Sequence, residues 1–313
     1  MSDLPFTGER FTPECVREMW YEHYHRSVFA RAITAGKRVA DVACGEGYGA
    51  ALLAPTAASV VGLDISAEAV AHAQSRYAAL GNLRFEQGDA SQLSWPDASI
   101  DVVTSFETLE HLHEQEALVA GFARVLTDSG VLLISSPDKK NYSDLRGYQN
   151  EFHVRELYRD ELLALLGRHF GAVRLYAQKL LFQSAIWRPD AASTAVMHTV
   201  DADGSVHDHA DYPPLYYIAV CAKHESQLPA LADLDLFGDA AESVYRHYEH
   251  EIRKNMQAGA VLQQADIDLT AERAAHAATR AQLEDVEGRL HMLQAQAAQT
   301  SWWRRWFKND GKA

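Results

Sequence analysis

Residues 41–49 of the 313-residue chain read Asp-Val-Ala-Cys-Gly-Glu-Gly-Tyr-Gly, and this stretch decides the fold. The apolar run that leads into it, residues 38–44 (RVADVAC), predicts a buried strand, and residues 47–55 predict a helix. Glycines at such a junction let the backbone approach a ligand closely, and the N-terminus of the next helix presents free N–H groups. The stretch therefore predicts a small-molecule site where the strand ends.

Working outward from this unit, strand-like and helix-like segments alternate over the first two-thirds of the chain. Strands are predicted over residues 38–44, 59–65, 83–89, 100–106 and 130–136, and helices over residues 47–55, 66–80, 114–126 and 159–170. Strands separated by helices form a parallel sheet that is covered on both faces, so we expect an α/β, doubly wound fold. Residues 172–179 and 215–223 predict two more strands, which we expect to pair antiparallel at a sheet edge because no convincing helix separates them.

Composition and charge exclude several classes of function. The chain has 29 Lys and Arg against 43 Asp and Glu, a formal net charge of −14, so no nucleic-acid partner is expected. No apolar run reaches the roughly 20 residues that span a bilayer, and the first residues (MSDLPFTGERF) lack the apolar core of a secretory signal. Cys15, Cys44 and Cys221 lie far apart, which fits a reducing cytoplasm. Residues 207–209 (HDH) have a metal-like spacing without an evident third ligand, so no metal site is predicted.

The glycine stretch alone leaves two kinds of ligand open. Gly45, Gly47 and Ala50 match the relaxed dinucleotide fingerprint, which keeps a nicotinamide-dependent oxidoreductase as an alternative. Asp41, directly before the glycines, favours a cationic ligand instead, because a carboxylate repels a pyrophosphate.

Two further acids lie at the ends of the next two strands. Asp64 ends the second strand, about 20 residues beyond the first glycine, where a carboxylate can accept from both ribose hydroxyls. Asp89, in a Gly-Asp-Ala triplet, ends the third strand, where it can accept from the amino group of adenine. These positions predict a nucleoside site with no need for phosphate, and S-adenosylmethionine fits it.

The motifs together resemble those of class I S-adenosylmethionine-dependent methyltransferases. They are DVACGEGYG, GLDIS, GDA, IDVVTSFETLEHL and LTDSGVLLISSP, and the resemblance covers roughly residues 38–223. It implies a seven-stranded, mostly parallel sheet with an antiparallel last strand, and S-adenosyl-L-methionine as the cofactor. The cofactor-binding residues that it implies are Asp41, Gly45, Glu46, Gly47, Asp64, Ile65, Asp89, Ala90, Phe106 and Glu107.

A narrower resemblance lies in FTGERFTPE, EHYHRSVFA and NEFHVRELY. These segments look like those of methyltransferases in bacterial surface polysaccharide (O-antigen) biosynthesis systems, some of which cap glycan chains. The resemblance implies O-methylation of a saccharide hydroxyl, with residues 1–36 as a cap over the cofactor site. A small-molecule or lipid methyltransferase and a non-catalytic scaffold of a glycan assembly complex are the alternatives.

Histidines are the candidate catalytic residues, because a hydroxyl is a weak nucleophile until its proton is removed and imidazole suits that task near neutral pH. His111 follows the fourth strand and His153 follows the fifth. For His111 the alternatives are capping of a helix and packing against the cofactor, and for His153 the alternative is a structural hydrogen bond within its loop. Glu107 and Glu110 are the alternative bases.

The chain is divided by its composition into a methyltransferase-like domain and a helical extension. The predicted parts are residues 37–225 with an insertion at 181–214, a linker at 226–239, a coiled coil at 240–298 and an aromatic, basic tail at 299–313. From Leu283 onward every seventh residue is apolar (Leu283, Leu290 and Ala297), while the pattern before Leu283 is weaker; this pattern predicts homo-oligomers through the coiled coil. The tail suits either an anionic membrane surface, with the protein peripheral at its cytoplasmic face, or a partner enzyme such as a glycosyltransferase.

Overall fold

The structure is a computed structural model that describes residues 18–181, 183, 195, 197–200, 205–210 and 212–309. Half of the predicted N-terminal cap and most of the predicted insertion therefore lie outside the described residues. The chain forms two units, residues 1–243 and residues 244–313, which are treated separately below.

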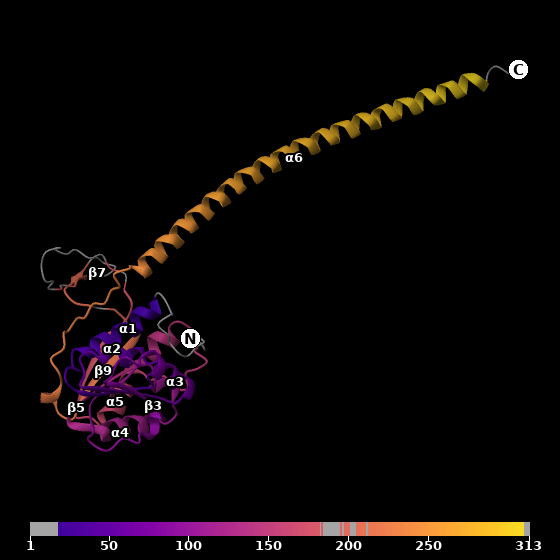
Figure 1. The fold of residues 1–313 in the computed structure, drawn as a ribbon. Helices are drawn as coiled ribbons and strands as arrows, with labels where there is room; N and C mark the ends of the chain where they lie inside the picture. Colours follow the sequence, from indigo (N-terminus) through magenta and orange to yellow (C-terminus); the bar gives the residue numbers. More distant parts are fainter. Residues whose placement is uncertain are drawn as a thin grey trace. The chain divides into compact units, whose positions relative to one another are not determined.

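A seven-stranded sheet forms the centre of the first unit (Figure 1). Its strands run in the order β3-β2-β1-β4-β5-β9-β6. Their bounds are β1 (Arg38–Val42), β2 (Ser59–Asp64), β3 (Leu83–Gln87), β4 (Ile100–Ser105), β5 (Leu126–Pro137), β6 (Ala172–Gln178) and β9 (Tyr216–Ala222). Strand β9 pairs antiparallel with both β5 and β6, and the other pairs are parallel. The predicted doubly wound sheet and its reversed last strand are confirmed.

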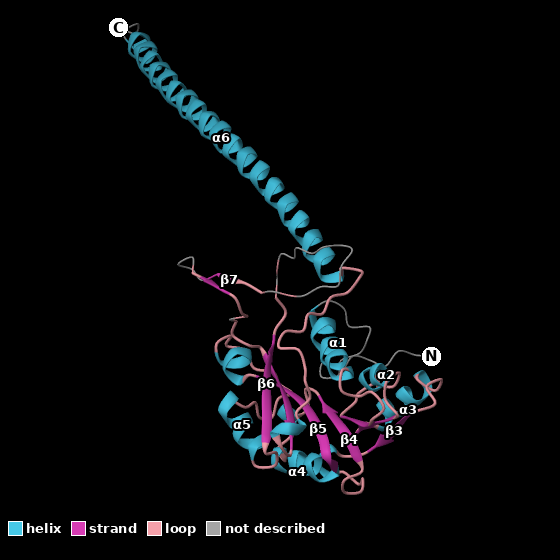
Figure 2. Ribbon diagram, turned by 90° about the vertical axis from the view of Figure 1, so that its left-hand side faces the viewer, coloured by secondary structure: helices cyan, strands magenta, loops and turns pink. Residues whose placement is uncertain are grey.

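Helices cover both faces of this sheet, with α4 and α5 on one side and α1, α2 and α3 on the other (Figure 2). Their bounds are α1 (Glu18–Arg31), α2 (Tyr48–Leu53), α3 (Ala67–Arg76), α4 (Gln115–Val125) and α5 (Arg159–Gly167). Alternate strand residues point to opposite faces, so Val102 packs in the core under α1–α3 and Val103 in the core under α4 and α5. Such two-sided burial explains the continuous apolar runs of these strands.

Several element boundaries differ from the sequence prediction. Ser66 caps α3 as predicted, since its hydroxyl accepts a hydrogen bond from the Ala69 N–H, but the helix ends at Arg76 rather than at residue 80. Strand β5 begins four residues earlier than predicted, at Leu126. In the insertion, the described residues include a two-stranded hairpin of β7 (Thr199–Val200) and β8 (Val206–His207).

The segment predicted as a linker contacts helix α1. The Phe237 ring lies against the rings of Trp20, Tyr21 and His25, and the Asp235 carboxylate lies 2.9 Å from Nε2 of His25. These contacts attach the linker segment to the same helix that reaches the site described below.

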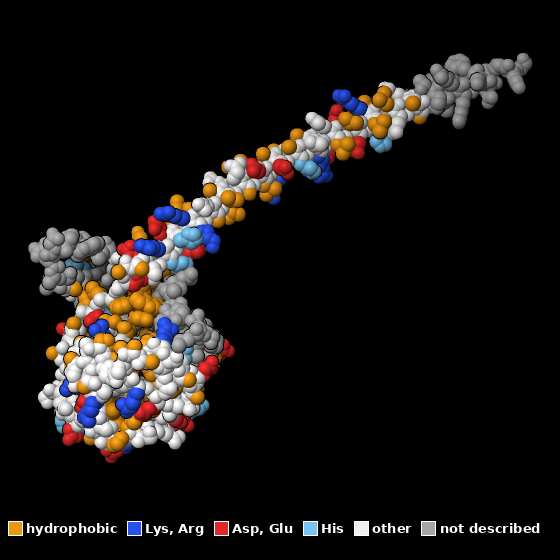
Figure 3. Space-filling view, viewed as in Figure 1, with side chains coloured by type: hydrophobic (Ala, Val, Ile, Leu, Met, Phe, Trp, Pro, Cys, Tyr) orange, Lys and Arg blue, Asp and Glu red, His pale blue; other side chains and the backbone are white. Residues whose placement is uncertain are grey.

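The second unit is a single helix of 67 residues, α6 (Ser243–Asn309). Apolar side chains recur along it between charged ones (Figure 3), and Leu283 and Leu290 are 57% and 54% exposed in the single chain. The helix agrees with the predicted helical extension, while its pairing into a coiled coil stays a prediction. Side chains of the aromatic tail lie outside the described residues. No helix in the described part of the chain is long and apolar enough to cross a membrane.

Candidate functional site

A cavity of about 360 Å³ lies at the carboxyl ends of β1, β2, β3 and β4. The fold determines its position, because the carboxyl ends of parallel strands meet at one edge of the sheet. Most of the predicted site residues line it: Asp41, Gly45, Asp64, Ile65, Asp89, Ala90, Phe106, Glu107 and His111. Its size falls within the range of small-molecule sites.

The glycine stretch forms a tight turn between β1 and α2. Gly45 and Gly47 have φ values of 55° and 90°, which residues with side chains rarely adopt. A Cβ atom on Gly47 would lie 2.6 Å from the Phe85 ring. The Asp64 carboxylate fixes the other side of the turn, since it accepts hydrogen bonds from the N–H groups of Gly45 (2.8 Å) and Ser66 (2.9 Å). This turn brings the backbone and two carboxylates, those of Asp41 and Asp64, to the cavity wall.

Asp41 is a buried acid at the floor of the cavity. It is 6% exposed, and one of its oxygens accepts a hydrogen bond of 2.8 Å from the Thr104 hydroxyl. Burial raises the pKa of Asp41 to about 6, so the carboxylate is ionised at neutral pH although it lies in a poorly solvated position. A cationic ligand would stabilise that charge.

The third acid and an exposed apolar side chain define the far end of the cavity. One oxygen of Asp89 accepts from both the N–H and the hydroxyl of Ser91, at 2.8 Å each, which fixes the carboxylate at the end of β3. Ile65 lies at the cavity wall and is 71% exposed, and such an exposed side chain can cover the flat face of a base.

Glu107, at the end of β4, is held by groups from two other elements. Its carboxylate accepts a hydrogen bond of 2.7 Å from the Ser135 hydroxyl of β5 and lies 3.5 Å from Nη1 of Arg26 of α1. The Arg26 side chain is fully buried and lies over the Tyr216 ring. Glu107 has a φ of 52°, and such strain in a residue with a side chain is common at functional sites.

The two candidate catalytic histidines differ in position. His111 lines the cavity, and its Nδ1 lies 2.9 Å from the carbonyl oxygen of Phe152. His153 is not among the described residues of the cavity lining. Its Nδ1 lies 2.6 Å from the Glu156 carboxylate and its Nε2 lies 3.0 Å from the Asn150 amide, which agrees with the structural alternative for this residue.

Two predicted cofactor-binding residues, Glu46 and Gly47, also fall outside the described cavity lining. Glu46 is 1% exposed and turns away from the cavity: its carboxylate accepts from the Tyr77 hydroxyl at 3.2 Å and lies 3.3 Å from Nη1 of Arg76. The Glu46 carboxylate thus attaches the glycine turn to α3, and a part for Glu46 in cofactor binding stays a prediction. Gly47 has a backbone role, as the left-handed residue at the start of α2.

Sequence reasoning missed side chains that α1 and α2 add to the cavity wall. His23 and Ser27 of α1 line it together with Tyr48 of α2. Burial, followed by the charge of Arg26, lowers the pKa of His23 well below its ordinary value, so this ring is neutral at neutral pH. His23 and Ser27 lie in the N-terminal EHYHRSVFA segment and Tyr48 lies in the glycine stretch, but the spacing of these segments does not reveal which side chains face the cavity.

Comparisons with known proteins agree with this geometry. Residues 40–134 match the model of the family described as "Methyltransferase domain". A protein of Mycolicibacterium smegmatis named "Probable S-adenosylmethionine-dependent methyltransferase" is 41% identical over 168 residues, which are 53% of this chain and 64% of that protein. One of Mycobacterium tuberculosis with a similar name is 40% identical over 52% of this chain and 60% of its own length. The chain thus spans less than two-thirds of the length of these relatives.

Two further comparisons are more distant. A "Fatty-acid O-methyltransferase" of Mycolicibacterium smegmatis is 39% identical over 113 residues, which are 35% of this chain and 40% of that protein. Among solved structures, the YcgJ protein of Bacillus subtilis superimposes with a TM-score of 0.47 and 21% identity, over 64% of this chain and 99% of that one.

Residues 40–134 of the first unit therefore match a methyltransferase domain, and the strand order with its reversed last strand is the one expected for class I S-adenosylmethionine-dependent methyltransferases. The cofactor of such a domain is S-adenosyl-L-methionine, and the residues present fit that molecule. The glycine turn leaves room for close backbone approach, the cavity carries acids at the ends of three adjacent strands, and one of these acids is buried and ionised at neutral pH.

Proposed function

We propose that the protein is an S-adenosylmethionine-dependent O-methyltransferase that acts on a saccharide hydroxyl. The proposal rests on one cavity whose lining runs from Asp64 and Asp89, at the ends of β2 and β3, to Glu107 and His111, which follow β4. Because the sheet order is β3-β2-β1-β4, Asp89 of the nucleoside end and Glu107 of the other end lie on opposite sides of Asp41. The methyl donor and an acceptor can therefore meet near the middle.

When bound, the cofactor would supply a methyl group on a positively charged sulfur; an acceptor oxygen would take this methyl group while its own proton passes to solvent and the electron pair of the carbon–sulfur bond returns to sulfur. The chain's own contribution is alignment and charge. Asp64 and Asp89 would hold the ribose and the adenine, and Asp41 would stabilise the cationic part. The cavity walls orient the acceptor and exclude water, which is the main requirement for an in-line displacement.

The acceptor end of the cavity carries three polar side chains beside Phe106 and Leu112, and these polar groups favour a polyhydroxylated acceptor. Glu107, Thr108 and His111 offer carboxylate, hydroxyl and imidazole groups there. A sugar can form further hydrogen bonds with such groups, whereas an alkyl chain would shield them from water and offer no hydrogen bond in return.

A fatty-acid carboxyl group is the second candidate acceptor, because one relative is named a fatty-acid O-methyltransferase. In both acceptors an oxygen atom would receive the methyl group, so the proposal of O-methylation is common to them.

The helical extension suggests how such an enzyme would be organised. We propose that α6 forms a coiled coil between copies of the chain, because its heptad leucines are exposed in the single chain. Attachment of the tail to a membrane surface or to a glycosyltransferase, capping of a surface glycan and a cytoplasmic location remain parts of this proposal.

Two experiments, carried out one after the other, test the proposed function. Calorimetry with S-adenosylhomocysteine and with NAD should show binding of the former only, and Asp64→Ala should abolish it; binding of NAD alone would restore the oxidoreductase alternative. Mass spectrometry of surface glycans with and without the gene should then show the loss of one CH₂ increment. Unchanged glycans together with lost fatty-acid methyl esters would favour the second acceptor, and an unchanged phenotype of Asp64→Ala cells would favour the scaffold.

A further inference from the structure

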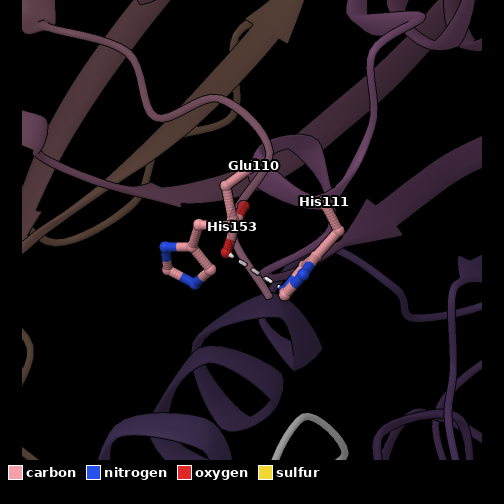
Figure 4. A group of neighbouring side chains, drawn as sticks. All are labelled: Glu110, His111 and His153. Atoms are coloured by element: carbon pink, nitrogen blue, oxygen red, sulfur yellow. Dashed lines mark ion pairs between the residues drawn. The ribbon is translucent and has the colours of Figure 1, made fainter. Parts of the chain in front are cut away.

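A compact group of three potential metal ligands lies beside the cavity. Glu110 and His111 belong to a short 3-10 helix, Leu109–His111, directly after β4, and His153 comes from the loop before α5. One ligand atom from each lies within 4.8 Å of the others. Figure 4 shows the Glu110 carboxylate between the two imidazole rings, with one oxygen 3.9 Å from Nε2 of His111.

The Glu110 carboxylate lacks the partners that a buried charge requires. The residue is 0% exposed, and neither of its carboxylate oxygens has a hydrogen-bond partner among the described residues. Its backbone, in contrast, is firmly held, since the carbonyl oxygen accepts from the N–H groups of Val154 (2.8 Å) and Arg155 (3.0 Å). An isolated buried carboxylate is costly, so this side chain needs either a proton or a cation.

The charges around Glu110 do not supply that cation. Arg26 is the nearby guanidinium, and it lies against Glu107 at 3.5 Å.

Both imidazole rings are oriented as metal-binding rings usually are. The carbonyl oxygen of Phe152 can only accept, so Nδ1 of His111 donates to it and Nε2 carries the lone pair. Nδ1 of His153 likewise donates to the Glu156 carboxylate. Metal-binding histidines almost always donate their second ring N–H to a carboxylate or a backbone carbonyl in this way. Nε2 of His153 accepts from the Asn150 amide at 3.0 Å, so this amide must turn aside for the ring to bind a metal.

We propose that Glu110, His111 and His153 bind a divalent transition-metal ion next to the methyl-donor cavity. One carboxylate with two imidazoles is the ligand set of catalytic zinc and of non-haem iron sites, whereas magnesium and calcium prefer oxygen ligands alone. Three protein ligands leave coordination positions open, and His111 is itself part of the cavity wall.

The role of the ion rests on the proposed function. A metal-bound alcohol or water loses its proton far more easily than a free one, so an acceptor hydroxyl bound at an open position becomes a nucleophile at neutral pH. The proton passes to solvent, and the oxygen's electron pair forms the new bond to the methyl carbon. The two histidines then act as ligands, not as bases.

Cobalt titration of the full-length, tag-free chain tests the site. After removal of bound metal with a chelator, Co²⁺ should bind one-to-one with the visible absorption of a site that includes nitrogen ligands. Loss of the group that accepts from a ligand histidine's second N–H costs roughly 10–100-fold in metal affinity, so Glu156→Gln should weaken binding by this factor and Glu110→Gln by at least about 100-fold. Glu116→Gln is the matched control, because this carboxylate also contacts a histidine, His169, but on the surface, and it should leave Co²⁺ affinity unchanged.

Calorimetry with S-adenosylhomocysteine on the same samples separates the two proposals. Glutamine matches the shape of a protonated glutamate, so Glu110→Gln should fold and still bind the nucleoside. Absence of one-to-one Co²⁺ binding, or equal affinity in wild type and Glu110→Gln, would overturn the metal site and leave Glu110 protonated. Intact Co²⁺ binding without nucleoside binding would instead overturn the proposed function and leave the metal site.

Discussion

Replacing Asp41 by Asn should stabilise the cofactor-free protein while weakening cofactor binding. Asp41 is buried, and its oxygens accept from the Thr104 hydroxyl and the Ala50 N–H. Asparagine has the same shape as aspartate, and its side-chain oxygen can still accept from the Ala50 N–H. Its amide can donate to the Thr104 hydroxyl oxygen. The Thr104 hydroxyl can then donate to the Ala40 carbonyl oxygen, which lies 3.4 Å away. The substitution therefore removes the buried charge with little loss of hydrogen bonding.

The size of the effect follows from the pKa. Burial raises the pKa of Asp41 from 3.8 to about 6, which corresponds to about 3 kcal/mol at 1.36 kcal/mol per pKa unit. The pKa of Asp41 is higher in the folded state than in the unfolded state. The destabilisation of the fold is therefore absent below pH 3.8, grows as the pH rises toward 6 and is constant at higher pH. Asp41→Asn should therefore raise the free energy of unfolding by up to about 3 kcal/mol at about pH 7.5, and by roughly half of that at about pH 5.

Urea unfolding of the cofactor-free chain, followed by near-ultraviolet circular dichroism, measures this difference. Asp101→Asn is the control with the opposite sign, since its hydrogen bonds with Arg38 lower the pKa of Asp101 to about 2, and its ionised form stabilises the fold above 3.8. Calorimetry should show that Asp41→Asn binds S-adenosylmethionine roughly 10–100-fold more weakly, as expected for one lost charged contact. If Asp41→Asn destabilised the protein at about pH 7.5 as Asp101→Asn does, the assignment of Asp41 as an uncompensated buried charge would be refuted.

Three further outcomes are expected. Asp64→Asn should weaken S-adenosylhomocysteine binding by roughly 10–100-fold in calorimetry, because it loses charged acceptor capacity for the ribose hydroxyls; unchanged affinity would contradict the assignment. Gly47→Ala should lower the thermal unfolding midpoint, since a φ of 90° and a Cβ 2.6 Å from Phe85 together cost of the order of 1–3 kcal/mol or more; an unchanged midpoint would argue against the tight turn. Replacing Leu283 and Leu290 by Asp should shift the sedimentation coefficient to that of a monomer; a monomeric wild type would disprove the coiled coil.

Much of the site could be predicted because it depends on strand ends. Asp41, Asp64 and Asp89 each follow a short apolar run, and parallel strands bring their carboxyl ends to one sheet edge whatever the lengths of the helices between them. The reversed strand was visible as two strand patterns without a helix between them, and β6 and β9 pair in that way.

Side-chain direction in turns and long-range pairs could not be predicted. The direction of Glu46 depends on the left-handed glycines on both sides of it and on Arg76 and Tyr77, about thirty residues further along the chain. The Arg26–Glu107 pair joins α1 to the end of β4, and no local pattern marks a buried arginine as the partner of a strand-end glutamate. Such contacts depend on how the helices and strands pack together, which the spacing of apolar residues along the sequence does not reveal.

A crystal structure of the full chain with S-adenosylhomocysteine would show directly whether the three strand-end acids hold the nucleoside. We expect the adenine between Ile65 and Asp89, the ribose hydroxyls on the Asp64 carboxylate and the sulfur toward Glu107. A nucleoside bound elsewhere on the protein, with these carboxylates facing an empty cavity, would contradict this expectation.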